Sequence, residues 1–125
     1  MTLFVLMLCT LFLSSCASTP HVDYIPQQRG KYVVASWYGH KFNGRLTASG
    51  ERFDMYAMTC AHKTFNFGTK LRVINPDNNK SVIVTVNDRG PFIRGRDLDL
   101  SYGAAKKIGI IEKGVGRVKI EHIPR

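Results

Sequence analysis

The segment from residue 70 to residue 87 constrains the fold most, because it joins two β-rich runs by a strong turn signal. In residues 81–87, a valine stands at every second position, so an extended strand there has one apolar face. Residues 70–75 form the other β-rich run, and Pro76-Asp77-Asn78-Asn79 lies between the two. We therefore expect a β-hairpin whose second strand packs one face on a core.

The rest of the chain also favours short strands. Residues 31–38, 55–61 and 117–123 are further β-rich runs, and Gly-rich turns separate many of them. One short helix is predicted at 102–108, with Ser101 as its N-cap and Gly109 at its end. A chain of 125 residues that is 44% hydrophobic supports one folded domain. This pattern predicts a small, mainly β barrel with one or two short helices.

The N-terminus has the features of a targeting segment. Residues 3–13 are apolar except for Thr10, and they are too few to span a bilayer, which takes about 20 residues. Leu13-Ser14-Ser15-Cys16 then matches a bacterial lipobox, in which the chain is cut before the cysteine and the thiol is acylated. We expect a lipoprotein signal peptide at 1–15, then lipidated Cys16 and a polar tether at 16–30. An ordinary secretory signal is the alternative.

Lipidation would place the domain on a membrane facing the cell wall. Ala17, rather than Asp, follows the acylated cysteine, which favours the outer membrane, facing the periplasm. The net charge of +9 lies entirely beyond Cys16. A basic exported domain suits an anionic wall polymer, and export argues against nucleic acid as the partner. The sequence has no paired-His or CxxC pattern, so we expect no metal site and no cofactor.

Cysteine usage leaves one free thiol in the predicted mature chain. Cys9 leaves with the signal and Cys16 carries lipid, so Cys60 has no intrachain disulfide partner. Cys60 is predicted to be a small buried residue. A catalytic thiol next to His62 is the alternative, because residues two apart in a strand share a face.

Three polar residues stand in distinctive local settings. Glu51 follows the small-residue loop at 47–50, His62 follows residues 58–61, and Asp88 ends an apolar run before Gly90-Pro91. Two acids and an imidazole can form a general acid/base site. Each also has a structural alternative: a solvated loop acid for Glu51, a core histidine for His62, and an Asx-turn for Asp88.

These stretches, within residues 32–110, resemble the rare lipoprotein A (RlpA-like) family of peptidoglycan lytic transglycosylases. The resemblance implies a six-stranded double-psi β-barrel at 31–125. It implies endolytic cleavage of MurNAc–GlcNAc β-1,4 bonds in glycan free of stem peptides, which leaves 1,6-anhydro ends. Asp88 matches the catalytic acid, with Glu51 and His62 as further catalytic positions. The chain stops at Arg125, so we expect no SPOR domain of the kind found in many members. We also expect a monomer.

Substrate contacts are expected from four residues: Trp37, Tyr38, Ser49 and Arg89. The two aromatic residues suit sugar faces, and they suit the core equally well. Two other functions stay open. One is an expansin-like module that binds the wall without cleaving it, and the other is a hydrolase that uses two carboxylates.

Asp97 and Asp99 are the other carboxylates that the sequence leaves open. They alternate with Leu98 and Leu100 directly before Ser101. We expect them to serve the helix N-terminus or to pair with arginines. If Asp88 is not the acid, Asp99 is the next candidate.

Overall fold

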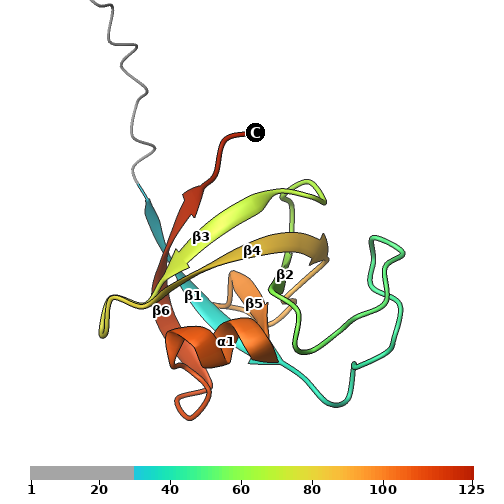
Figure 1. The fold of residues 1–125 in the computed structure, drawn as a ribbon, viewed down its shortest axis with the longest axis horizontal. Coiled ribbons are helices and arrows are strands. Elements are labelled where there is room, and N and C mark those ends of the chain that lie inside the picture. Colours follow the sequence, from blue (N-terminus) through green and yellow to red (C-terminus); the bar gives the residue numbers. More distant parts are fainter. Residues whose placement is uncertain (1–29) are drawn as a thin grey trace, which may run out of the picture.

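The computed structural model describes residues 30–125, which form six strands and one helix (Figure 1). In chain order these elements are β1 (Lys31–Tyr38), β2 (Thr59–His62), β3 (Lys70–Ile74), β4 (Ser81–Asp88), β5 (Leu98–Ser101), α1 (Tyr102–Ile108) and β6 (Val115–His122). The predicted signal peptide, Cys16 and nearly all of the predicted tether lie outside the described residues. Within residues 30–125, no helix is long and apolar enough to cross a membrane.

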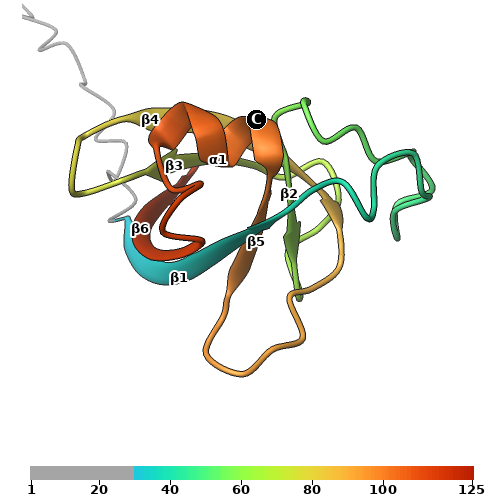
Figure 2. The same ribbon diagram turned by 90° about the horizontal axis from the view of Figure 1, so that it is seen from below.

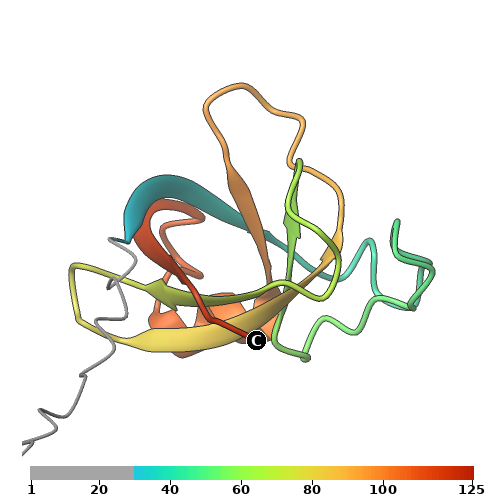
Figure 3. The same ribbon diagram turned by 90° about the horizontal axis from the view of Figure 1, so that it is seen from above.

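The six strands close into a barrel in the order β1-β5-β2-β4-β3-β6, seen from two sides in Figures 2 and 3. β1 pairs with β5 and β2 with β4 in parallel, and the remaining neighbours are antiparallel. Closure leaves no strand with an unpaired edge. The small six-stranded barrel expected from the sequence is confirmed. Figures 2 and 3 also show the β4–β5 connection projecting from the barrel.

The alternation in β4 correctly predicts which side chains enter the core. Val82, Val84 and Val86 are buried inside the barrel, whereas Ile83 between them is 46% exposed. Burying a valine side chain stabilises the fold by roughly 1.5–3 kcal/mol. The hairpin with β3 has the predicted turn, in which Asn75 is buried and its side-chain amide donates a hydrogen bond to the Ile108 carbonyl at 2.8 Å.

Two strands differ from the sequence prediction. The run at 55–61 is extended only from Thr59 to His62, because residues 54–57 form a turn in which the Ala57 N–H bonds to the Asp54 carbonyl. β5 was not predicted as a strand. Its four residues pair with β1 on one side and β2 on the other. Such a short strand owes its stability to these partners, which lie far away in the sequence.

The helix has its predicted boundaries. The Ser101 hydroxyl accepts a hydrogen bond from the Ala104 N–H at 3.2 Å, which makes it the N-cap. Gly109 ends the helix with a φ of 76°, a left-handed conformation that glycine adopts without a steric cost. Ser101 is also the last residue of β5, so this cap fixes the helix directly onto the barrel.

Candidate active site

Two carboxylates open onto one pocket of the barrel. Asp88 ends β4 and Asp99 lies in β5, and both pair in register with Ala61 of the strand between them. Cross-strand neighbours share a face of the sheet, so both side chains flank the small Ala61 methyl. The pocket has a volume of about 280 Å³. Its lining residues are Tyr38, Phe42, Ala61, Asp88, Arg89, Gly90, Pro91, Phe92, Ile93 and Asp99.

Asp88 is held in place by backbone groups. Its Oδ1 accepts hydrogen bonds from the Ala48 and Arg89 N–H groups, each at 2.9 Å. The first of these bonds ties the carboxylate to the loop that carries Glu51. Among the described residues, the hydrogen bonds to Asp88 all end on Oδ1. The other oxygen is therefore available to a ligand in the pocket.

Asp99, the next candidate for the acid after Asp88, also lines this pocket. Among the described residues, it makes no hydrogen bond that caps the helix and no ion pair with an arginine. Its Oδ1 accepts a hydrogen bond from the Ser36 hydroxyl at 3.0 Å. Burial raises the pKa of the Asp99 carboxyl. The hydrogen bond with Ser36 and the Arg96 charge oppose the rise, and the Asp88 charge adds to it. The period-two alternation of Asp97 and Asp99 with two leucines was the signal for a strand that presents its acids on one face.

Glu51 lies on a loop docked against the end of β4. The Ser49 N–H donates to the Asn87 carbonyl at 3.3 Å, and the Asn87 side chain donates to Glu51 Oε2 at 3.4 Å. The Ser49 hydroxyl lies 2.8 Å from the Thr47 hydroxyl, so it supports the loop itself. Glu51 is exposed and does not line the pocket. The structure thus places Glu51 outside the pocket lining, on the loop that contacts Asp88 through the Ala48 N–H.

Arg89 is fixed in position at the pocket wall. Its Nη1 donates to the Phe65 carbonyl at 2.8 Å and to the His62 carbonyl at 3.3 Å. The guanidinium carbon lies 3.9 Å from the centre of the Phe67 ring, a cation–π contact. A guanidinium held on several sides loses little further freedom when it binds a ligand.

His62 does not line the pocket. Its Nδ1 accepts hydrogen bonds from the Thr64 and Phe65 N–H groups at 3.1 and 3.0 Å. The imidazole also stacks on the Phe65 ring, with centroids 3.5 Å apart. Burial is the main cause that lowers the pKa of His62 below its usual value. The structure therefore brings Asp88 and Arg89 together in the pocket. His62 lies outside the lining, where its carbonyl contacts the Arg89 guanidinium.

The two aromatic candidates separate. Tyr38 lines the pocket and stacks on Phe53, with ring centroids 4.4 Å apart. Burial, with Asp88 and Asp99 nearby, raises the pKa of the Tyr38 hydroxyl, so it keeps its proton. Trp37 lies outside this lining and packs against the core, where its indole N–H donates to the Ile111 carbonyl at 3.2 Å. Neighbouring strand residues point to opposite faces, which accounts for this division.

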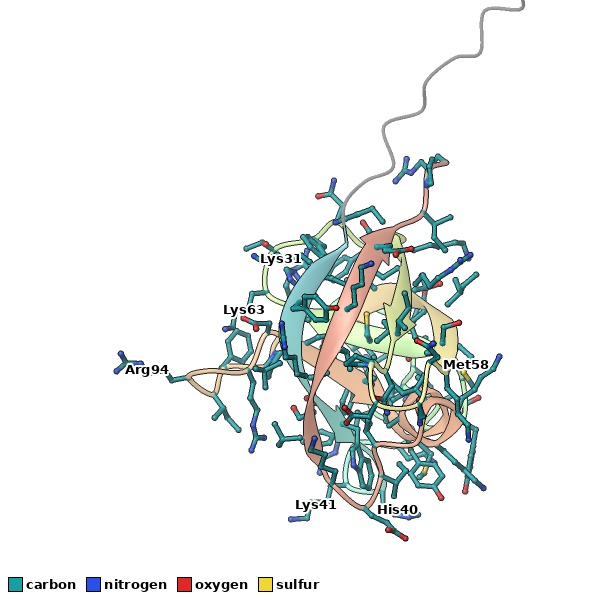
Figure 4. The ribbon with its side chains drawn as sticks, turned by 90° about the vertical axis from the view of Figure 1, so that its left-hand side faces the viewer. Lys31, His40, Lys41, Met58, Lys63 and Arg94 are labelled. Carbon is teal, nitrogen blue, oxygen red and sulfur yellow. The ribbon has the colours of Figure 1, made fainter. Side chains whose placement is uncertain are left out.

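Exposed apolar side chains form the rim of the pocket. Phe92 and Ile93, on the β4–β5 connection, are 83% and 56% exposed, and Phe42 on the other wall is 46% exposed. Arg94 stands at the tip of this connection, well away from the barrel (Figure 4). The pocket thus has exposed apolar side chains at its mouth and the positive charge of Arg89 in its wall.

Other features of the described residues do not add chemistry. Cys60 is fully buried in β2, and burial raises the pKa of its thiol, which opposes formation of a nucleophilic thiolate. Within residues 30–125, no group of three or more His, Cys, Asp or Glu side chains is arranged to hold a metal ion. A larger hollow of about 520 Å³ lies beside residues 122–125, but no Asp or Glu lines it.

Comparison with known proteins identifies the family. A family model described as lytic transglycolase matches residues 31–120. The chain belongs to this family. A relative from Pseudomonas aeruginosa (strain UCBPP-PA14), named endolytic peptidoglycan transglycosylase RlpA, is 60% identical over 90 residues, which are 72% of this chain and 26% of the relative. The resemblance to the RlpA-like family is confirmed. The chain spans between about a quarter and two fifths of the length of the curated relatives it matches.

Solved structures of other proteins show the same fold. A Streptomyces papain inhibitor superposes with a TM-score of 0.60 at 21% identity, over 80% of this chain and 99% of the inhibitor. An expansin from Clavibacter michiganensis gives a TM-score of 0.60 at 21% identity, over 76% of this chain and 50% of the expansin. At this identity the similarity concerns the fold alone. The expected double-psi β-barrel is thereby confirmed for this RlpA-like domain.

Proposed function

We propose that this domain is a lytic transglycosylase that cleaves MurNAc–GlcNAc β-1,4 bonds of peptidoglycan. The observation that carries the proposal is the pair Asp88 and Asp99, which open onto one pocket in a member of a lytic transglycolase family. Such a reaction needs a group that first donates and then accepts a proton. It also needs a surface that holds a sugar chain across that group.

Asp88 is the proposed acid and base. In its protonated form it gives its proton to the glycosidic oxygen, and the bond from MurNAc C1 to that oxygen breaks as positive charge develops on the sugar. The MurNAc C6 hydroxyl then attacks C1 and returns its proton to the Asp88 carboxylate. No water is consumed, and the new end is a 1,6-anhydro sugar. The two N–H bonds to Oδ1 orient the side chain and leave Oδ2 for this exchange.

The neighbouring groups have supporting roles in this scheme. The raised pKa of Asp99 favours its protonated form, so Asp99 is the second candidate for the acid. Glu51, which accepts a hydrogen bond from Asn87, is proposed to stabilise the developing positive charge or to orient the sugar. Arg89, Tyr38 and Ser49 are the proposed substrate contacts. Trp37 is withdrawn from this role, because its ring is used by the core.

Glycan free of stem peptides is the proposed substrate. The cleavage is proposed to be endolytic, a word that the names of the relatives carry. The exposed rings of Phe42 and Phe92 supply flat apolar faces of the kind on which sugars pack. The domain is proposed to act as a monomer and without a cofactor.

A hydrolase is the second candidate, and one observation favours it. Because Asp99 shares the pocket with Asp88, one carboxylate is available to activate water while the other protonates the leaving group. Inverting hydrolases work in this way. The products separate this mechanism from the proposed one, because hydrolysis adds water and ring closure does not.

Mass spectrometry of the products released from purified sacculi tests the proposal. We expect oligosaccharides of several lengths with 1,6-anhydro-MurNAc ends, each about 18 Da lighter than the hydrolysis product. Reducing MurNAc ends would instead establish a hydrolase. Binding to sacculi with no released sugar would establish an expansin-like module.

The location of the domain is a separate proposal. We infer that it acts in the cell envelope, held at the outer membrane by lipid on Cys16 and facing the periplasm. Cys16→Ala is then expected to abolish the incorporation of labelled palmitate and to leave the signal segment uncut. If the wild-type protein is found soluble in the periplasm without acyl chains, the anchor is refuted.

A further inference from the structure

The turn after β2 is built around the imidazole of His62. Its Nδ1 accepts two backbone hydrogen bonds, from Thr64 at 3.1 Å and from Phe65 at 3.0 Å. The ring also lies parallel to that of Phe65, with an interplanar angle of 8°. A nitrogen that accepts hydrogen bonds carries no proton, so the neutral imidazole has its proton on Nε2. An Asn side chain folds an Asx turn in the same way, with Oδ1 in the place of Nδ1.

The same turn presents two carbonyl oxygens to Arg89. These are the His62 and Phe65 carbonyls, which both accept from Arg89 Nη1, at 3.3 and 2.8 Å. If the turn opened, both carbonyls would move. Of its side-chain contacts among the described residues, the guanidinium would then keep the one with the Phe67 ring. A continuous set of contacts therefore leads from the His62 imidazole through the turn to the Arg89 side chain.

Arg89 connects the turn to the pocket. It lines the pocket beside Asp88, and its backbone N–H donates to Asp88 Oδ1 at 2.9 Å. His62 lies outside that lining. The two backbone hydrogen bonds thus occupy the Nδ1 acceptor of the imidazole. Of these two side chains, Arg89 is the one that can contact a ligand in the pocket.

We propose that His62 is a positioning residue, whose Nδ1 folds the turn that fixes Arg89 at the pocket, and that it exchanges no proton with the substrate. This inference rests on the proposed function, in which Arg89 contacts the glycan. The family resemblance implied a catalytic role for His62, and the proposal replaces that role with positioning of Arg89.

The role requires a neutral ring. Protonation would put a hydrogen on Nδ1, which would then face two N–H donors and could no longer accept from them. Burial is the main cause that opposes protonation, so the pKa of His62 lies below its usual 6.5. Of the charged groups near the ring, Asp97 favours the protonated form, and Arg89, Lys63 and His122 oppose it. Activity should therefore fall as the pH drops from about 6.5 through this lowered pKa.

A matched pair of substitutions distinguishes the two edges of the ring. His62→Asn keeps an acceptor where Nδ1 stands and lacks any group at Nε2, whereas His62→Gln places its amide near Nε2. We expect folded His62→Asn to release product within about tenfold of wild type, because loss of a general acid or base would cost about 10²–10⁴-fold. Its acid limb below pH 6.5 should be absent. His62→Gln should lose as much activity as Arg89→Lys, and the double variant should lose no more than either single variant.

The opposite ranking would overturn the inference. An active His62→Gln with an inactive but folded His62→Asn would mean that His62 acts through Nε2 on the substrate. Nitrogen NMR provides a readout that is independent of activity, because wild type should show the Nε2–H tautomer at neutral pH. An Nδ1–H tautomer would refute the turn. If wild type releases no product but shows the Nε2–H tautomer, the proposed function fails while the structural role of His62 stands.

Discussion

Asp88→Asn tests the proposed acid most directly, because the structure predicts that the fold survives it. The two hydrogen bonds that hold Asp88 come from the N–H groups of Ala48 and Arg89 and end on Oδ1. Asparagine also has an acceptor oxygen at Oδ1, so it can accept the same two bonds. The substitution replaces only Oδ2, which is the atom proposed to carry the transferable proton.

The expected cost in stability is small. Hydrogen bonds to a charged group contribute about 1.5–3 kcal/mol each and neutral ones about 0.5–1.5 kcal/mol, so two weakened bonds cost about 2 kcal/mol. Loss of the negative charge at Asp88 also relieves repulsion with Asp99, which acts in the other direction. The net change in the free energy of unfolding should therefore stay within about 2 kcal/mol. Turnover should fall by about 10²–10⁴-fold, the usual contribution of general acid/base catalysis.

The assay compares anhydro-sugar release from sacculi with thermal unfolding of the same samples. Asp77→Asn is a matched control, because Asp77 lies in the exposed hairpin turn and its side chain is 73% exposed. It should match wild type in both measurements. Folded Asp88→Asn with turnover within about tenfold of wild type would refute Asp88 as the acid, since that loss lies below the range for general acid/base catalysis. Asp99→Asn would then be expected to show the large loss.

Three further substitutions follow from burial and exposure. Because folding raises the pKa of Asp99, its carboxyl favours the folded state most at acid pH, where it is protonated. This contribution to the free energy of unfolding is lost as the pH rises above 3.8 through the raised pKa. Asp99→Asn should therefore unfold at a higher temperature than wild type at pH 7 and lose this advantage at low pH. Cys60→Ala should keep activity within a few-fold and cost about 1–2 kcal/mol in a melt, as for a small core truncation. Phe92→Ala should leave the melting temperature unchanged and weaken sacculus binding, whereas Ile83→Ala, equally a change of an exposed apolar residue, should not.

Each of these has a contradicting result. A lower melting temperature for Asp99→Asn at pH 7 would mean that its hydrogen bond with Ser36 outweighs the cost of burying the charge. An inactive, folded Cys60→Ala would revive the thiol mechanism. Equal binding by Phe92→Ala and wild type would remove the exposed rim from the substrate site.

Local sequence determined the elements whose signals are local. The β4 valines repeat every second residue, and this period alone assigns one face to the core. Ser101 and Gly109 bound the helix because an N-cap hydroxyl and a left-handed glycine satisfy backbone groups within one turn. Residue types matched in order along the chain also indicated the family and Asp88.

Tertiary structure decided everything that depends on which strands become neighbours. β5 exists because β1 and β2 flank it, and that pairing turns Asp99 toward the pocket. Tyr38 and Trp37 are adjacent in sequence, yet only the barrel determines which of them meets the pocket and which meets the core. His62 shows the same limit, because its role depends on Arg89, which is 27 residues away along the chain. Strand pairing in a closed barrel is non-local, so periodicity and spacing cannot specify it.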